Sequence, residues 1–383
     1  MDFFPHPRDL GGTLLGRIWS PQAGGPAVVT IRDGLVVDIT AAAAPLVSDI
    51  CEMDDPAAYV AGAAGQAVGS LAAISANRPG DRAKPHFLAP CDLQAVKACG
   101  VTFAQSMVER VIEEKAAGDP KRAQEVRARV GAAIGGSLRN VRAGSSEAAA
   151  VKAALIAEGL WSQYLEVGIG PDAEVFSKAQ VLSSVGPGAE VGLHPVSKWN
   201  NPEPEIVLAV SSRGRIVGAT LGNDVNLRDV EGRSALLLSK AKDNNASCAI
   251  GPMIRLFDAT FTLDDVRAAE LDLTVSGEDG FELKGHSSMK EISRDPEELV
   301  RQTVGRHHQY PDGLMLFLGT LFAPTRDRDV KGEGFTHKLG DVVTIASPGL
   351  GSLTNVVRLS TECPEWTFGT RALMRNLAER KLI

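Results

Sequence analysis

Residues 201–208 read Asn-Pro-Glu-Pro-Glu-Ile-Val-Leu, so that Glu203 and Glu205 stand two positions apart where an apolar run begins. Side chains alternate along a strand, and these two carboxylates are therefore predicted to project from the same face. Two carboxylates on one face repel each other unless a cation lies between them, and such oxygen ligands suit magnesium, manganese or calcium. The pair alone also fits an exposed strand edge with two solvated glutamates, so other segments must decide between the two interpretations.

Two further polar segments follow downstream. Residues 222–229 read Gly-Asn-Asp-Val-Asn-Leu-Arg-Asp and follow the apolar run 216–221, which places Asp224 at the end of a strand. A third carboxylate there would complete a facial set of oxygen ligands, although Asn and Asp also stabilise ordinary turns. Residues 240–245, Lys-Ala-Lys-Asp-Asn-Asn, precede Gly251-Pro252 and taken alone fit a solvated loop.

The composition of the whole chain excludes several classes of protein. The 383 residues fit one large domain plus a small one, and 44% hydrophobic and 23% charged residues are ordinary globular values. A net charge of −7 without a Lys/Arg block argues against binding to nucleic acid. Five cysteines without a CxxC pair suit reduced thiols. With no signal peptide and no run near the ~20 apolar residues of a membrane helix, we expect a cytoplasmic protein without a membrane partner.

The order of the predicted elements indicates an α+β, β-rich fold. Residues 1–80 form a predicted small N-terminal domain, in which Asp33-Gly34 joins two β-branched runs as a hairpin. A helical pattern covers residues 96–118, and a helical insertion is expected at about 119–160. Short β-type runs separated by turn residues follow from about residue 176. A β-rich main domain, which holds the carboxylates of the predicted metal site, is therefore expected at 85–383.

The order and spacing of the three polar segments resemble the catalytic domain of the fumarylacetoacetate hydrolase superfamily. That family has a Glu-x-Glu strand, then Asn-Asp-x-x-x-Arg-Asp, then a lysine some ten residues before Gly-Pro. Residues 317–320, Phe-Leu-Gly-Thr, and the segments 339–343 and 349–355 are similar to its closing strands. The resemblance covers about residues 85–360. It implies a mixed β-roll with a small N-terminal α/β module and a helical insertion, assembled as a homodimer or homotetramer.

The resemblance also implies a set of site residues. Glu203, Glu205 and Asp224 would bind a divalent metal, Mg²⁺ or alternatively Mn²⁺, while Arg228, Lys242 and Thr320 would lie around the substrate. The family often has a lysine at the position of Lys178, which we leave outside the catalytic set.

One departure from the family pattern bears on the reaction. Family hydrolases often carry Asn-Tyr-x-x-His-x-x-Glu, where the histidine and glutamate activate water. Here Ser106 stands at the histidine position and Glu109 is retained, and serine cannot act as a general base near neutral pH. Residues 100–110, 122–160 and 319–324 are similar to the branch of 2-keto-3-deoxy-pentonate dehydratases, which make 2-oxoglutarate semialdehyde from xylonate- or arabinonate-derived acids in non-phosphorylative pentose catabolism. In that branch Ser106 would line the substrate.

This resemblance leads to a hypothesis for the chemistry on a small 2-oxo acid. Lys242 would take the C3 proton or bind the enolate oxygen, and Glu109 would protonate the leaving C4 hydroxyl. One alternative is a carbon–carbon hydrolase of an acylpyruvate or a 2,4-diketo-3-deoxy sugar acid. A second alternative is a metal-binding scaffold protein that has lost turnover.

Overall fold

The computed structural model describes residues 1–126, 141–157, 159, 161–321, 324–331 and 333–383. Part of the helical insertion predicted at 119–160 and part of the family-like segment 319–324 therefore lie outside the described residues.

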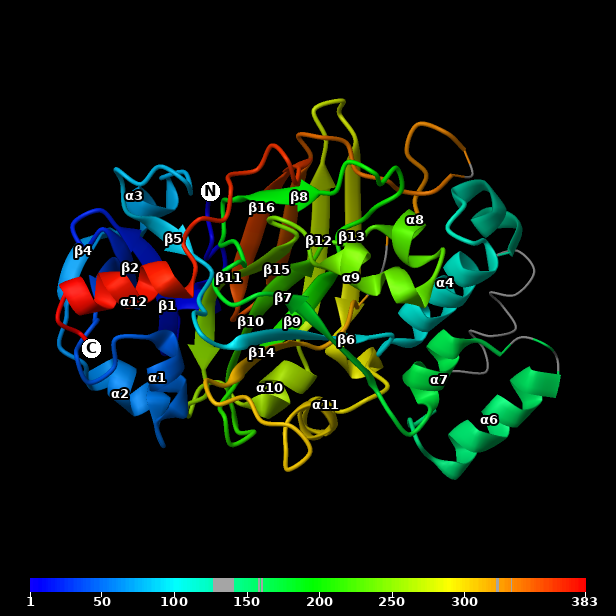
Figure 1. The fold of residues 1–383 in the computed structure, drawn as a ribbon, viewed down its shortest axis with the longest axis horizontal. Helices are drawn as coiled ribbons and strands as arrows, with labels where there is room; N and C mark the ends of the chain where they lie inside the picture. The colour runs from blue at the N-terminus through cyan, green and yellow to red at the C-terminus, as the bar shows by residue number, and fades with distance from the viewer. Residues whose placement is uncertain (127–140, 158, 160, 322–323, 332) are drawn as a thin grey trace.

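A mixed sheet of eleven strands extends through the molecule (Figure 1). Along its path the strands pair antiparallel, except for the parallel pair β14–β6. In spatial order the strands are β4 (Gln66–Ser70), β3 (Leu35–Asp38), β2 (Gly25–Arg32), β1 (Leu14–Ser20), β11 (Cys248–Leu256), β10 (Ile216–Asp224), β9 (Pro204–Val210), β14 (Leu314–Phe317), β6 (Ala95–Gly100) and β7 (Glu174–Ala179), with β5 (His86–Leu88) paired to β1.

A second mixed sheet covers one face of the first. Its strands in spatial order are β13 (Glu282–Ser288), β12 (Glu270–Ser276), β15 (Val342–Ser347), β16 (Gly351–Leu359) and β8 (Glu190–Leu193). Strand β9 is buried along its whole length, since Ile206, Leu208 and Val210 pack toward this second sheet while Val207 and Ala209 face a separate core. A strand covered on both faces has an almost continuous apolar sequence, as residues 206–210 do. The predicted α+β, β-rich fold is confirmed.

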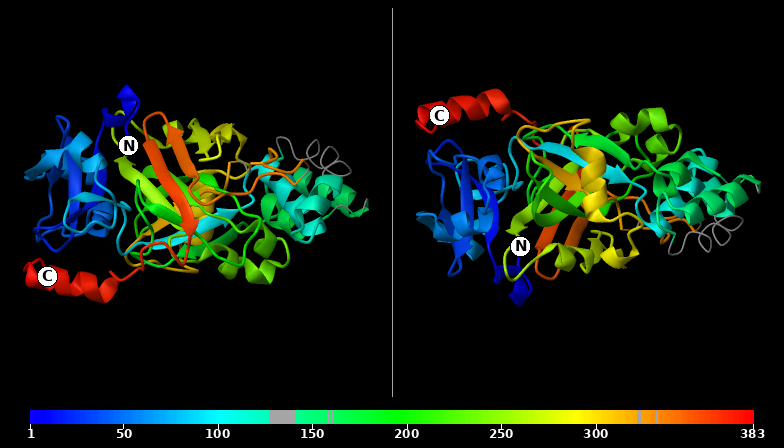
Figure 2. Two further views of the ribbon diagram at one scale, coloured as in Figure 1. Left: turned by 90° about the horizontal axis from the view of Figure 1, so that it is seen from above. Right: turned by 90° about the horizontal axis from the view of Figure 1, so that it is seen from below.

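Residues 1–80, predicted as a small domain, join the rest of the eleven-stranded sheet through strand pairing and contact the C-terminal helix. Strand β1 pairs with β11, with Leu14 opposite Arg255. The predicted hairpin is present between β2 and β3, where Asp33 and Gly34 both have positive φ. Helix α12 (Thr370–Glu379) lies beside the N-terminal strands in both views of Figure 2. The side chain of Asn376 donates a hydrogen bond to the carbonyl of Ala23, in the turn between β1 and β2 (2.8 Å). The module's own helices are η1 (Pro7–Leu10), α1 (Val47–Glu52), α2 (Pro56–Gly62) and α3 (Leu71–Ser75).

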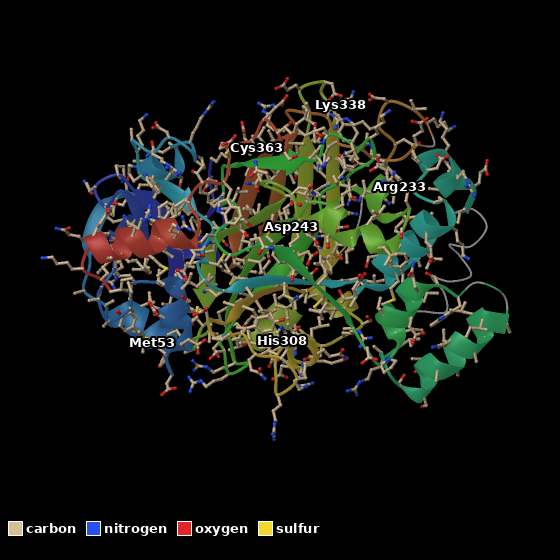
Figure 3. The ribbon with its side chains drawn as sticks, in the orientation of Figure 1. Met53, Arg233, Asp243, His308, Lys338 and Cys363 are labelled. Atoms are coloured by element: carbon tan, nitrogen blue, oxygen red, sulfur yellow. The ribbon has the colours of Figure 1, made fainter. Side chains whose placement is uncertain are left out.

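Helices gather at the opposite end of the molecule, near Arg233 in Figure 3, whereas Met53 marks the N-terminal end. Helices α4 (Ala104–Lys115), α6 (Ser146–Ala157) and α7 (Gln163–Ile169) share a hydrophobic cluster there. The remaining described helices are α8 (Arg228–Glu231), η2 (Ala235–Leu237), α9 (Leu238–Lys242), α10 (Leu263–Arg267), η3 (Met289–Glu291) and α11 (Pro296–Thr303). In the part of the chain that the structure describes, no helix is long and apolar enough to cross a bilayer.

The predicted helix over residues 96–118 is wrong in its first part. Residues 95–100 form strand β6, in which buried Val96 and Ala98 alternate with the half-buried Lys97. The helical sequence pattern runs on into α4, but pairing of residues 95–100 with β14 and β7 makes them a strand.

Candidate metal centre

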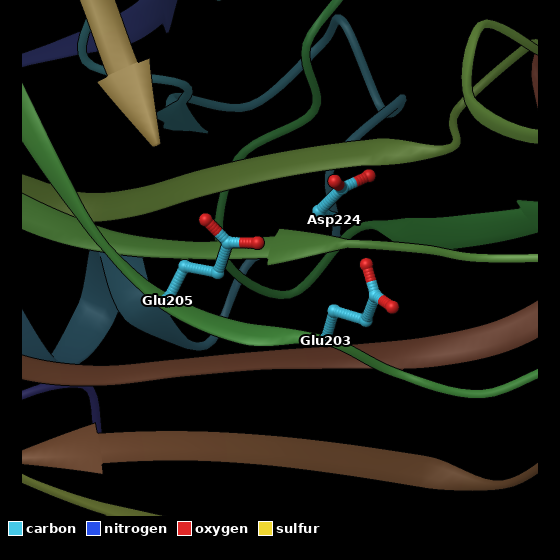
Figure 4. Close-up of side chains that lie close together, drawn as sticks. All are labelled: Glu203, Glu205 and Asp224. Atoms are coloured by element: carbon cyan, nitrogen blue, oxygen red, sulfur yellow. The ribbon is translucent and has the colours of Figure 1, made fainter. Parts of the chain in front are cut away.

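Glu203, Glu205 and Asp224 converge at the ends of two neighbouring strands (Figure 4). Strand β9 begins at Pro204 and pairs with β10, so that Glu205 lies opposite Gly222. Glu203 is fixed beside Asp224 because the Asp224 amide donates to the carbonyl of Glu203 (3.0 Å). One oxygen of each carboxylate lies within 4.8 Å of the other two, and the three residues are only 1–2% exposed. The structure therefore places the three predicted ligands together.

Two buried lysines neutralise part of this negative charge. The Nζ of Lys242, at the end of α9, lies 2.5 Å from Glu203 Oε2 and 3.0 Å from Asp224 Oδ2. Lys178, on β7, places its Nζ 2.8 Å from Asp224 Oδ1 and donates to the backbone carbonyl of Lys242 (2.5 Å). Burial lowers the pKa of Lys242, but the carboxylates of Asp224, Glu203 and Glu231 outweigh burial and raise that pKa overall. In this arrangement Lys242 is a cation.

Glu205 is a buried carboxyl group whose ionised form requires a nearby positive charge. Burial, followed by the charges of Asp224 and Glu203, raises the pKa of Glu205 well above its ordinary value. Its Oε2 accepts a hydrogen bond from the amide of Gly319 (2.7 Å). Gly319 has φ 99°, and an added Cβ would lie 2.0 Å from Thr102 Oγ1, so only glycine fits there. A buried carboxylate cluster that resists ionisation fits a hard divalent cation, and three oxygen donors suit Mg²⁺ or Mn²⁺.

Helix α4 turns a charged face toward the triad. Ser106, Glu109, Arg110 and Glu113 follow the i, i+3, i+4, i+7 spacing of one helix face, and all four are buried. The Arg110 guanidinium contacts Glu203 Oε1 and lies 2.7 Å from Glu113 Oε2. Burial at this face is tolerated because the charges are paired.

Arg228 is held on several sides. Its Nε donates to Glu113 Oε1 (2.6 Å), its Nη1 donates to the carbonyl of Pro324 (3.1 Å), and its Nη2 lies 3.4 Å from Glu109 Oε2. The guanidinium also stacks over the ring of Trp199 at 4.5 Å. Arg228 thus ties α4 to the segment that follows β14, and a direct contact with substrate stays a prediction.

The other two predicted substrate residues are also buried. The hydroxyl of Ser106 donates a hydrogen bond to the carbonyl of Phe103 (2.8 Å), the N-cap residue of its own helix. Thr320 follows the glycine that binds Glu205 and is 6% exposed. Their roles toward substrate stay predictions.

Sequence reasoning missed Glu174 and Phe176, which share one face of β7 with Lys178. The ring centre of Phe176 lies 5.7 Å from Lys242 Nζ. Glu174 lies opposite Gly100, and a Cβ at Gly100 would be only 1.9 Å from Glu174 Oε2. Burial and the charge of Glu231 raise the pKa of Glu174 to about 7, against the opposing effects of Arg110 and Lys242. The signal available in the sequence was alternation: residues i−2 and i−4 of Lys178 share its face.

Residues 168–358, just under half of the chain, match the model of the fumarylacetoacetate hydrolase C-terminal family. The resemblance inferred from the ordered motifs is thereby confirmed. The region contains the triad, both lysines and Arg228, whereas α4 precedes it.

Curated relatives point to one branch of the family. The chain is 32% identical over 194 residues to the probable 2-keto-3-deoxyxylonate dehydratase of Haloferax volcanii, covering 51% of this chain and 63% of the relative. It is 30% identical over 188 residues to the 2-dehydro-3-deoxy-D-arabinonate dehydratase of Saccharolobus solfataricus, covering 48% and 58%. The chain therefore spans less than two thirds of the length of these relatives.

Solved structures share the fold. A 2-keto-3-deoxy-D-arabinonate dehydratase complexed with magnesium and 2,5-dioxopentanoate matches with a TM-score of 0.61 at 21% identity, covering 90% of this chain and 99% of that chain. A fumarylacetoacetate hydrolase from Exiguobacterium antarcticum matches with a TM-score of 0.54 at 16% identity, covering 91% and 100%. Dehydratase and hydrolase thus share this fold, and the site must distinguish them.

Proposed function

We propose that this protein is a Mg²⁺-dependent dehydratase that converts a 2-keto-3-deoxy-pentonate to 2-oxoglutarate semialdehyde, with Mn²⁺ as an alternative metal. The observation that carries the proposal is the buried triad Glu203, Glu205 and Asp224 with Lys242 against it. The names of the two curated relatives support the substrate class. The magnesium-bound neighbour is complexed with 2,5-dioxopentanoate, which is the same compound as the proposed product.

The reaction breaks a C3–H bond and a C4–O bond. A divalent ion held by the triad would withdraw electrons from the substrate's carboxylate and 2-oxo group, which acidifies the C3 hydrogens. Lys242 takes the C3 proton or donates to the enolate oxygen. A bound divalent ion would neutralise Asp224 and Glu203, which exert the two largest effects that raise the pKa of Lys242. Burial, which lowers that pKa, and the smaller raising effect of Glu231 would remain. The C4 hydroxyl leaves as water, and tautomerisation gives the aldehyde at C5.

Two carboxyl groups are candidates for the acid that protonates the leaving hydroxyl. Glu109 is the residue proposed from the sequence, and its carboxylate faces Arg228. Glu174 is the candidate that the structure adds, because it lies on the face of β7 that reaches the triad through Lys178. With its pKa raised to about 7, Glu174 retains its proton below about pH 7, as an acid catalyst must.

The pH profile separates these two candidates. If Glu174 is the acid, kcat of the wild-type protein should fall above about pH 7, because the protonated form of Glu174 is lost as the pH rises. Glu174→Gln should lower kcat by about 10²- to 10³-fold and remove that alkaline fall. Glu109→Gln should keep it. Full turnover and an unchanged pH profile in Glu174→Gln would mean that another residue protonates the leaving hydroxyl. Full turnover in Glu109→Gln would exclude Glu109 from that role.

The proposed activity is tested by following the product directly. The purified protein is incubated with Mg²⁺ and 2-keto-3-deoxy-D-xylonate or the arabinonate epimer, with a coupled aldehyde dehydrogenase reporting 2-oxoglutarate semialdehyde. We expect product from at least one epimer, loss of activity on chelation with EDTA, and recovery when Mg²⁺ is added back. No product from either epimer, together with pyruvate release from an acylpyruvate, would identify a hydrolase instead. The homodimer or homotetramer stays a prediction for light scattering to test.

A further inference from the structure

A continuous line of five buried charges leads away from the triad. Glu203 contacts Arg110, Arg110 contacts Glu113, Glu113 contacts Arg228, and Arg228 reaches Glu109. The residues are 1–7% exposed. The two ends of this line are a predicted metal ligand and a predicted catalytic acid, so its middle member can influence both without touching either.

Glu113 is that middle member and divides its carboxylate between two arginines. Its Oε1 lies 2.6 Å from both Nε and Nη2 of Arg228, and its Oε2 lies 2.7 Å from Nη1 of Arg110. Burial raises the pKa of Glu113, but Arg228 and Arg110 outweigh burial and lower it, so this carboxylate stays ionised. Glu113 is thus a fixed anion that competes with the triad for Arg110.

Arg110 has three acidic neighbours and two terminal nitrogens with which to reach them. Its Nη2 is directed at Glu203, while its Nη1 is directed at Glu113 and lies 3.1 Å from Glu231 Oε2. A carboxylate that is fully paired with a guanidinium is a poorer metal ligand, because the cation and the metal compete for the same oxygens. The way in which Arg110 divides its contacts among these three carboxylates therefore determines how readily Glu203 can bind a metal.

We propose that Glu113 is a positioning residue that anchors Arg110 and so keeps Glu203 available to a divalent metal. The inference rests on the proposed metal site. It differs from a purely structural role in one respect: the effect of Glu113 on metal affinity passes through Arg110 alone. Residues outside the ligand set that orient metal ligands typically change metal affinity by about 10- to 100-fold when they are mutated.

The test measures Mn²⁺ affinity by electron paramagnetic resonance, without any substrate. Glu113→Gln should weaken Mn²⁺ binding about tenfold, because Arg110 then pairs more fully with Glu203. Arg110→Met should bind Mn²⁺ at least as well as the wild-type protein, and adding Arg110→Met to Glu113→Gln should restore binding. Unchanged affinity in a folded Glu113→Gln variant overturns the proposal. If Glu113→Gln does not fold, the Mn²⁺ affinities of Arg110→Met and of the double variant are compared instead. Weaker Mn²⁺ binding by the double variant than by Arg110→Met would overturn the proposal.

Asp341→Asn provides the matched control. Asp341 is 1% exposed and its carboxylate pairs with Arg328 at 2.6 and 2.9 Å. Its loss therefore also removes one of two carboxylates from a buried arginine, which keeps Asp279 at 3.0 Å. This variant should lose stability and keep its Mn²⁺ affinity, and a loss of affinity as large as that of Glu113→Gln would show a general structural effect and overturn the proposal. Absence of Mn²⁺ binding by the wild-type protein would instead refute the metal site itself, which distinguishes the two failures.

Discussion

Replacing Glu205 by glutamine is expected to lower kcat about a thousandfold and, at the same time, to stabilise the metal-free protein at pH 7. The loss of activity follows because the metal would lose an anionic ligand, and metal-based charge stabilisation contributes several kcal/mol to such reactions. The gain in stability follows because burial and the charges of Asp224 and Glu203 raise the pKa of Glu205. Glutamine keeps the shape, can still accept the Gly319 hydrogen bond, and carries no charge.

The size of this stabilisation depends on pH in a defined way. A carboxyl group whose pKa is raised by folding destabilises the fold increasingly as the pH rises above its unfolded value near 4.5. The advantage of Glu205→Gln in thermal unfolding should therefore be present at pH 7 and shrink toward pH 4. An equal or lower melting temperature at pH 7 would contradict the prediction.

Glu203→Gln is the matched comparison, because it should remove metal-dependent activity with the opposite effect on stability. Glu203 accepts from Lys242 Nζ at 2.5 Å and from Arg110, so its loss leaves two buried cations with fewer partners. Breaking a buried ion pair by removing one partner typically costs about 3–5 kcal/mol. If the two glutamines changed the melting temperature in the same direction, the charge balance described for the triad would be wrong.

Local sequence rules were sufficient for the parts of the fold that local forces determine. The Asp-Gly turn at residues 33–34, the strand that starts at Pro204, and the strand that ends at Asp224 all depend on period-two alternation and turn chemistry. Strand β6 was missed because its identity depends on pairing with β14 and β7, which lie far away in the chain. Such tertiary pairing overrides a helical pattern and cannot be read from a single window.

The same distinction applies to the site. The triad could be predicted because its members lie on adjacent strands at short separation in sequence, and the family motifs give their order. The contact of Glu113 with Arg228 joins residues 115 positions apart, and no periodicity in either segment signals it. Lys178 and Glu174 are an intermediate case. The position of β7 beside the triad is known only from the three-dimensional structure. Once Lys178 is placed there, alternation along the strand puts Glu174 on the same face.

Replacing Lys242 by methionine is expected to lower kcat by about 10³-fold while leaving Mn²⁺ binding intact or stronger. Loss of a general base typically costs about 10²- to 10⁴-fold in rate, and methionine keeps most of the volume of the lysine stem. Metal binding persists because the ammonium group lies 2.5 Å from Glu203 and 3.0 Å from Asp224 and so competes with a cation for those oxygens. Weaker Mn²⁺ binding would mean that Lys242 organises the triad instead of acting on substrate.

Exchange of the C3 hydrogen separates the two roles left open for Lys242. In D₂O, a protein that can remove the C3 proton but cannot expel the C4 hydroxyl will exchange deuterium into its substrate. Glu174→Gln should therefore retain exchange if Glu174 is the acid, and Lys242→Met should lose it if Lys242 is the base. If Lys242→Met keeps exchange while losing turnover, Lys242 binds the enolate oxygen and another residue is the base. Lys178→Met is the matched control: Lys178 contacts Asp224 at 2.8 Å and the backbone of Lys242, so its loss should disturb the metal ligand and leave slow exchange in place.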